Sequence, residues 1–169
     1  MRTIAAFTLT ALLAVPSFAQ ESPKPGPEHD FLKKHEGNWT TTMKFGGMDS
    51  KGTVTYKMEL GGLWMSGTME SEMFGTKFTG KSLDSFDAGK KKYVSVWVDS
   101  MSTGPVITEG TFDAAKKVLT MEGTGPGQDG KPSKYKSTTE MTDDDTIVFT
   151  MYMGDVKEAS FVVTYKRKK

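Results

Sequence analysis

Between Trp39 and Tyr165 the chain alternates hydrophobic and polar residues in short segments, which are separated by Gly, Asp, Asn and Lys. Alternation with a period of about two residues is typical of β-strands that bury one face. The clearest case is segment 53–60, in which Val, Tyr, Met and Leu alternate with Thr, Thr, Lys and Glu. The pattern predicts about ten strands and no long helix. We expect them at 39–45, 53–60, 63–73, 77–86, 93–99, 106–112, 118–122, 135–141, 146–152 and 159–165.

A series of antiparallel strands must protect its two edges, and closure into a barrel is a common solution for a domain of this size. Two nearly identical segments, Phe-Asp-Ala-Gly-Lys-Lys at 86–91 and Phe-Asp-Ala-Ala-Lys-Lys at 112–117, each join one predicted strand to the next. Asp followed by small and basic residues is hairpin-turn chemistry. The glycine-rich segment 123–132 is expected to be the longest loop and a candidate lid. The pattern therefore predicts an all-β, up-and-down antiparallel barrel of about ten strands.

The N-terminal segment has the features of a secretory signal peptide. Arg2 precedes an apolar run from Ile4 to Val15, and small residues at Ser17 and Ala19 fit a cleavage site. We expect residues 1–19 to be removed by a cut between Ala19 and Gln20, which places the protein in the periplasm or outside the cell. The run is too short for a permanent membrane span, so no stable membrane insertion is expected.

The remaining chain divides into a lead-in and one domain. Segment 20–36 is proline-rich at its start and includes a short helical candidate at 28–36, which would cover one end of the barrel. Segment 37–169 would form the barrel itself. The chain has 169 residues, no Cys and a formal net charge of +1, so it forms no disulfide and offers no strongly basic face for nucleic acid.

Reactive side chains are scarce. The two histidines, His29 and His35, both precede the predicted barrel and do not share a helix face, so we predict no metal site and no cofactor. Without Cys, and without His in the barrel, nucleophilic catalysis lacks support. Methionine is abundant, with 12 residues, and could bind copper(I) or line an apolar cavity; we favour the cavity.

Several motifs resemble known families. Gly37-Asn38-Trp39 resembles the Gly-x-Trp signature of lipocalin-type barrels, in which the Trp plugs the closed end. A wider resemblance includes Glu28-His29, Gly61-Gly62-Leu63-Trp64, Phe86-Asp87, the run from Lys92 to Met101, and Glu109-Gly110. Together these residues resemble the bacterial family called domain of unknown function 1579. The resemblance implies a lipocalin-like barrel without an established activity, in which Trp39 would be a structural plug.

Segment 93–99 has hydrophobic side chains on both faces, so it breaks the alternation of apolar and polar residues. Val94, Val96 and Val98 lie on one face, and Tyr93, Trp97 and Asp99 lie on the other. We favour an inward orientation of the Tyr93 face, since a cavity wall tolerates mixed aromatic and polar side chains. Glu109 on the next strand would then meet Asp99, and the two carboxylates could orient a polar head group or carry out acid-base chemistry. With the valines inward, the same residues would be a surface ladder.

We therefore expect an exported barrel that binds a small, mainly apolar or amphipathic molecule in its interior, rather than an enzyme. The candidate lining residues are Met43, Tyr56, Met58, Met65, Tyr93, Trp97, Asp99, Glu109, Phe149 and Met151. One alternative is a small-substrate enzyme that uses Asp99 and Glu109. Another is a filled barrel that acts as a protein-interaction module, with a homodimer formed through an exposed apolar strand face.

Overall fold

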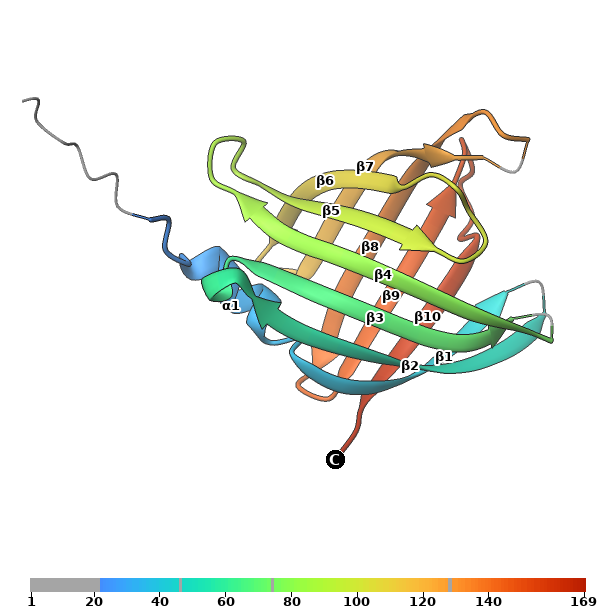
Figure 1. Ribbon diagram of the computed structural model, residues 1–169, viewed down its shortest axis with the longest axis horizontal. Helices are drawn as coiled ribbons and strands as arrows, with labels where there is room; N and C mark the ends of the chain where they lie inside the picture. The colour runs from blue at the N-terminus through green and yellow to red at the C-terminus, as the bar shows by residue number, and fades with distance from the viewer. Residues whose placement is uncertain (1–21, 46, 74, 128) are drawn as a thin grey trace, which may run out of the picture.

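Ten antiparallel strands close into a barrel, and a short helix lies across one end (Figure 1). This computed structural model describes residues 22–169 apart from 46, 74 and 128, so the predicted signal peptide at 1–19 lies outside the described residues. The elements are α1 (Pro27–Lys33), β1 (Gly37–Phe45), β2 (Met48–Glu59), a 3-10 turn (Leu60–Gly62), β3 (Trp64–Met73), β4 (Thr76–Asp87), β5 (Lys92–Asp99), β6 (Val106–Asp113), β7 (Val118–Pro126), β8 (Pro132–Asp143), β9 (Thr146–Met153) and β10 (Phe161–Arg167).

Each strand pairs with the next one along the chain, and β1 pairs with β10 to close the barrel. The closing register runs from Trp39 opposite Arg167 to Lys44 opposite Val162. Closure gives each of the ten described strands a paired neighbour on both sides. The expected ten-stranded up-and-down barrel is thereby confirmed, with a helix that ends at Lys33, a few residues earlier than the pattern predicts.

The two repeated segments form the same hairpin turn. The Oδ1 atom of Asp87 accepts hydrogen bonds from the backbone N–H groups of Gly89 and Lys90, at 2.9 and 3.0 Å. In the second copy, Oδ1 of Asp113 accepts from Ala115 and Lys116, both at 3.0 Å. The Asp side chain thus satisfies the turn backbone, as its chemistry predicts.

The prediction of a long loop at 123–132 was wrong. Strand β7 continues to Pro126 and β8 begins at Pro132, with Gly123 opposite Tyr135 in the register. A Cβ at Gly123 would overlap the backbone of Ile107 on β6. Glycine is therefore needed here for the close approach of neighbouring strands, and it marks a strand position rather than a turn.

The hydrophobic core lies inside the barrel in two clusters that meet at mid-height. One cluster joins α1 to the surrounding wall and is formed by Phe31, Leu32, Met65, Tyr93, Leu119 and Met121. The other extends along β1, β10 and their neighbours and is formed by Trp39, Met43, Val54, Met69, Phe78, Ile147, Val163 and Tyr165. The two clusters share contacts with Tyr56 and Met141.

Candidate functional site

The strand register decides which side chains face the barrel interior. Trp97 lies opposite Ser82 on β4 and Val106 on β6, and it packs against the interior cluster that includes Phe78. Tyr93 is buried, whereas Val98 is 44% exposed. The structure therefore places the Tyr93, Trp97 and Asp99 face of β5 inside and its valines outside.

The helix end of the barrel is closed by aromatic packing. The ring centroid of Phe31 on α1 lies 4.3 Å from that of Phe112 and 5.6 Å from that of Tyr93. The Tyr93 hydroxyl donates a hydrogen bond of 3.0 Å to the carbonyl of Glu28. Met58 and Met65 belong to the same cluster. These three predicted lining residues, Tyr93, Met58 and Met65, thus pack beneath the helix.

Trp39 and Arg167 connect the helix to the last strand. Trp39 is fully buried, and its Nε1 donates a 2.8 Å hydrogen bond to the carbonyl of His35. The Arg167 guanidinium lies 4.1 Å from the centroid of the Trp39 ring. It also donates to the carbonyls of Lys34 and Glu36, at 2.8 and 2.7 Å. The chain after α1 is therefore held against β10 at this end.

His35 is the titratable group at the centre of this closed end. It is 5% exposed, and its Nδ1 lies 3.0 Å from the carbonyl oxygen of Phe31. Burial lowers the pKa of His35 to about 4, and the nearby Arg167 charge acts in the same direction. The imidazole is accordingly neutral at pH 7. It packs within the plug, by which we mean α1, the residues up to Glu36, and Trp39.

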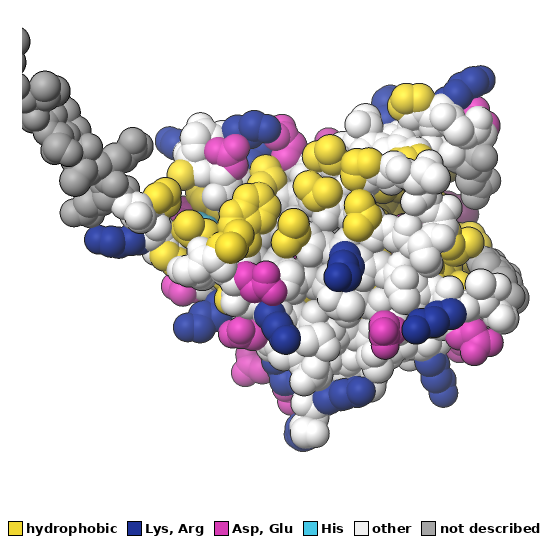
Figure 2. Space-filling view, viewed as in Figure 1, with side chains coloured by type: hydrophobic (Ala, Val, Ile, Leu, Met, Phe, Trp, Pro, Cys, Tyr) yellow, Lys and Arg dark blue, Asp and Glu magenta, His cyan; other side chains and the backbone are white. Residues whose placement is uncertain are grey.

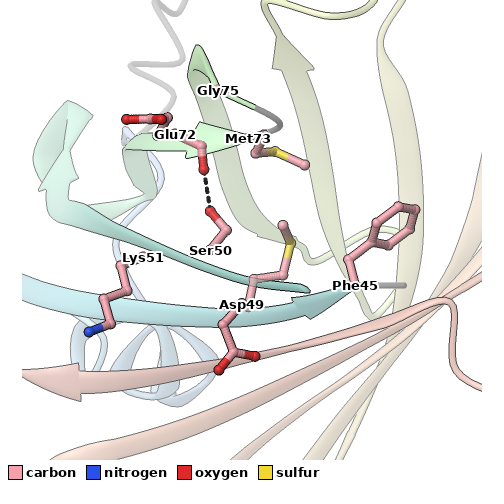
Figure 3. Close-up of a pocket in the computed structure, with 8 residues that line it drawn as sticks. Phe45, Asp49, Ser50, Lys51, Glu72, Met73 and Gly75 are labelled. Carbon is pink, nitrogen blue, oxygen red and sulfur yellow. Dashed lines mark hydrogen bonds between the residues drawn. The ribbon is translucent and has the colours of Figure 1, made fainter. Parts of the chain in front are cut away.

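The opposite end of the barrel has a pocket of about 600 Å³. Pairing between β2 and β3 ends at Gly52 and Ser71, so the two hairpin tips beyond these residues diverge. The hydroxyl of Ser50 donates to the carbonyl of Glu72 across the gap. Figure 3 shows Phe45 and Met73 on the interior side, with Asp49 and Lys51 pointing away. The pocket is lined by Met43, Phe45, Asp49, Ser50, Lys51, Glu72, Met73 and Gly75.

Trp97 forms part of the interior wall at this open end. Its Nε1 donates a 2.8 Å hydrogen bond to Oδ2 of Asp99, whose Oδ1 accepts from the backbone N–H of Met101 at 2.8 Å. The ring stacks on Phe78 with an interplanar angle of 22°, and it occupies the space that a side chain at Gly80 would need. Asp99 therefore fixes the orientation of the indole and the loop after β5.

Phe149 and Met151 also face the interior on this side. Phe149 lies opposite Val163 and packs against the same core cluster as Trp97, and Met151 lies opposite Phe161. Of the predicted lining residues, Met43, Trp97, Phe149 and Met151 thus surround the open half, while Tyr56 lies at mid-height, where the two clusters meet.

A polar group lies at mid-height inside the barrel. Ser82 Oγ donates a 2.7 Å hydrogen bond to Oδ2 of Asp84, and Ser95, opposite Asp84 in the register, also hydrogen-bonds to this carboxyl. Tyr56 and Tyr165 are hydrogen-bonded to each other. Burial raises the pKa of Asp84, and it raises the pKa of Tyr165 to about 12. These residues form a polar zone inside the barrel, in which Tyr165 is buried and Asp84 keeps an intermediate exposure.

Gly67 shows how closely this polar zone is packed on one side. A Cβ at Gly67 would lie 2.5 Å from Ser82 Oγ and 2.7 Å from Cε1 of Tyr56. Tyr56 and the serine that holds Asp84 therefore lie side by side, which is possible because β3 has no side chain here.

Asp84 is an interior residue that the sequence interpretation missed. It shares the inward face of β4 with Phe78 and Phe86, while the outward Lys77 and Lys81 alternate with that face. The sequence contained a signal for this position, because a carboxylate with the same parity as two inward-facing aromatic residues is a charged side chain on the apolar face.

The expected pairing of Glu109 with Asp99 is wrong. Glu109 lies opposite Val94 on the outer face of the barrel, where it forms ion pairs with Lys90 at 3.0 Å and Lys92 at 2.6 Å. The two lysines lower the pKa of the Glu109 carboxyl. The sequence predicted Glu109 on the inner face, whereas the structure has it on the outer face. The register between β5 and β6, which decides this, was not known from the sequence.

The outer wall carries a row of exposed apolar side chains. Leu83, Val96 and Ile107 lie in one line across β4, β5 and β6, and Leu83 and Ile107 are 46% and 55% exposed. Figure 2 shows hydrophobic side chains gathered over β4 and β5. This row is one apolar strand face through which two copies could pair, a possibility that the sequence leaves open.

A second pocket, of about 700 Å³, lies on the outer side of β7 and β8. Its rim contains two ion pairs, Lys134 with Asp155 and Lys136 with Glu122, both at 2.9 Å. All four side chains of these pairs are more than half exposed. Exposed pairs of this kind contribute little energy, so this groove is a solvated surface feature.

Within the described part of the chain, no group of three or more His, Cys, Asp or Glu side chains is arranged to hold a metal ion. His29 and His35 both lie in the plug, where Nδ1 of His29 accepts a 3.0 Å hydrogen bond from the backbone N–H of Gly26. Among the described residues, no helix has the length and apolar character needed to cross a membrane.

Comparisons with known proteins match the chain to a family without a known role. A family described as "Protein of unknown function (DUF1579)" matches residues 24–167. No curated protein matches the chain. A solved structure of a redesigned beta barrel is 12% identical, covers 81% of this chain and 94% of its own, and has a TM-score of 0.46.

Proposed function

The chain belongs to the DUF1579 family of proteins of unknown function. We propose that it binds a small amphipathic molecule inside its barrel, and that the molecule enters from the end opposite α1. The family carries no activity that could be transferred. The proposal rests on the geometry of the barrel, and above all on the difference between its two ends.

That difference is the observation that supports the proposal most. At one end α1 and Trp39 cover the interior, and at the other the hairpin tips diverge around a pocket of about 600 Å³. Ligand pockets are concave, mainly apolar and of about 300–1,000 Å³. Met43, Phe45 and Met73 supply apolar lining, and Met side chains adapt to ligands of different shape.

The exposure of interior side chains gives further support. Trp39 and Ile147 near the closed end are at most 2% exposed, whereas Trp97, Phe149 and Asp84 keep an intermediate exposure although they face inward. Inward side chains that border unfilled space keep accessible surface. A completely filled barrel would bury them to the same degree as Trp39.

The enzyme alternative loses its basis. Asp99 holds Trp97 inside the barrel mouth, and Glu109 is ion-paired on the outside of the wall. The two carboxylates therefore cannot act on one substrate in the manner of a general acid and base, because both groups must reach the reacting atoms.

A fluorescent probe tests the proposal directly. N-phenyl-1-naphthylamine is neutral and apolar, and its emission rises when it leaves water. We expect saturable binding by the chain from Gln20, and a dissociation constant at least about fivefold weaker for Met73→Lys, because the new charge would have to be desolvated beside the probe. Glu70→Lys places the same residue on the outer face of the same strand and should leave binding unchanged.

Two results would contradict the proposal. One is the absence of saturable binding by the folded protein. The other is equal weakening by Met73→Lys and Glu70→Lys, which would mean that the probe binds the outer surface. Native mass spectrometry of protein purified from its own host adds an independent test, since a retained amphipathic compound should appear as a mass shift.

A further inference from the structure

Asp84 is an unusual side chain for its position. Among the inward-facing residues that the structure describes on the ten strands, the carboxylates are Asp84 and Asp99, and the only basic group is Arg167. Asp99 is occupied at the mouth by Trp97 and Met101. Arg167 is occupied at the closed end by Trp39 and by backbone carbonyls. Asp84 is therefore an inward carboxylate of intermediate exposure, without a cationic partner among the described residues inside the barrel.

An unpaired carboxylate inside a barrel is costly, since part of its water shell is lost and hydroxyl groups replace it. Ser82 and Ser95 donate hydrogen bonds to Asp84. An ionised carboxylate has about four acceptor positions, so two serine hydroxyls leave capacity for further donors. A side chain with these properties is retained at binding sites more readily than in a passive core.

The polar zone and the open end share the inward face of β4. Phe78 and Asp84 both face inward on β4, separated by about 20 Å of strand, which the tilt of barrel strands shortens along the axis. Phe78, Trp97 and Met69 line the interior between the mouth and Asp84, and Trp97 keeps an intermediate exposure. A ligand with an apolar chain toward the mouth could therefore extend its polar end to Asp84.

Building on the proposed function, we infer that Asp84 anchors the polar end of the ligand and that this end is a protonated amine. An ammonium group has three donors and a positive charge, so it would satisfy the free acceptors of Asp84 and neutralise the buried charge. The ring edge of Tyr56 lies next to Ser82 at Gly67, so this side chain belongs to the same polar zone. Fatty acids should be excluded, because a second carboxylate would face Asp84 without a cation between them.

Three ligands of equal chain length separate these possibilities: dodecylamine, dodecanol and dodecanoate, titrated below their aggregation concentrations into the chain from Gln20 at pH 7. We expect dodecylamine to bind tightest and dodecanoate weakest, with at least about a tenfold difference between the two. Asp84→Asn should remove the advantage of the amine while leaving dodecanol binding within about twofold.

The control variant is Glu109→Gln, which makes the same carboxylate-to-amide change on the outer wall and should keep the preference for the amine. Dodecanol also reports on folding, because a variant that binds it normally has an intact interior. If Asp84→Asn does not fold, the order of the three ligands in the wild-type protein still decides the matter.

The outcomes separate the two proposals. Failure of all three ligands to bind would overturn the proposed function and this inference with it. Binding of dodecanol without any advantage for dodecylamine, or an advantage that survives Asp84→Asn, would overturn the role of Asp84 alone and leave the binding barrel in place.

Discussion

The two ends of this barrel are built from the same strands, yet they differ in what fills them. At the helix end, Phe31, Trp39 and His35 are each less than 10% exposed, and Arg167 connects the plug to β10. At the other end, Phe45 and Met73 are only partly buried around a pocket of about 600 Å³. One end has the packing of a protein core, and the other has the features of a binding site.

This difference indicates how the molecule divides stability and function. Burial of large apolar side chains is the main favourable term in folding, and the largest fully buried side chains, Trp39 and Ile147, lie near the helix end. A site that must admit a ligand cannot be filled by the protein's own side chains. We therefore expect substitutions at the helix end to affect unfolding, and equivalent substitutions at the open end to affect binding.

The largest expected effect compares two tryptophans. Trp39→Ala should lower the free energy of unfolding by about 3–5 kcal/mol, because it leaves a large cavity and removes the hydrogen bond to His35. Trp97→Ala should cost about 1–2 kcal/mol, since its ring is only partly buried, but it should weaken probe binding. Urea unfolding followed by circular dichroism measures both. Equal costs for the two variants would remove the proposed division between the ends.

The next effect is a pH dependence that belongs to the helix end. The pKa of His35 is lowered to about 4 by burial, whereas an unfolded His has a pKa of about 6.5. As the pH falls below the unfolded value, the unfolded chain binds a proton that the folded protein does not. The contribution of neutral His35 is thus complete above the unfolded pKa and is lost as the pH falls toward about 4.

The loss should be on the order of 3 kcal/mol across this window. His35→Asn is the comparison, because its side-chain N–H can still donate to the carbonyl of Phe31 but does not titrate. The difference between the urea midpoints of the two proteins should therefore change between pH 7 and pH 4. Parallel pH profiles would show that His35 is charged, or exposed to water, in the folded protein.

A smaller effect tests the link between the plug and the last strand. Arg167→Lys should cost about 1–3 kcal/mol, since an ammonium group cannot donate to the carbonyls of Lys34 and Glu36 while stacking on Trp39. Lys169→Ala, at the exposed terminus, is the control and should change the thermal midpoint little. If Arg167→Lys proved as stable as the wild type, the guanidinium contacts would add nothing to the closed end.

The sequence was most informative where a local pattern has one structural meaning. Alternation with a period of two predicted the strands, and the Asp at the start of each repeated turn predicted the bonds that Asp87 and Asp113 accept. Gly37 followed by Trp39 placed a buried Trp at the start of β1, where the structure has it.

The sequence was least informative where the answer depends on register between strands. Glu109 and Asp99 were expected to meet, but the pairing of Val94 with Glu109 turns the Glu outward. Gly123 was interpreted as part of a loop, because the close approach of β6 that requires glycine is a tertiary feature. The group around Asp84 combines residues from β2, β4, β5 and β10, and no local pattern brings these four strands together.

The smallest expected effect concerns Asp84. Substitution of this residue should raise the free energy of unfolding, whereas the preceding substitutions should lower it. Burial raises the pKa of Asp84, so the folded protein holds the proton more tightly than the unfolded chain does. The stability that this group contributes is present below the unfolded pKa, and it is lost as the pH rises through the folded pKa. Asp84→Asn should therefore stabilise the ligand-free protein at neutral pH by about 1 kcal/mol.

This gain should be larger at pH 8 than at pH 4, because near the unfolded pKa the folded protein holds the proton and the unfolded chain is only partly ionised, so the amide offers little advantage. The Asp84 charge acts on two titratable groups, Tyr56 and Tyr165, and both hydroxyls stay protonated over this range because burial raises the pKa of each. Urea unfolding at the two pH values measures the difference. A destabilised Asp84→Asn protein would show that the carboxylate serves the fold, whereas a stabilised variant that has lost its preference for amines is what a binding residue predicts.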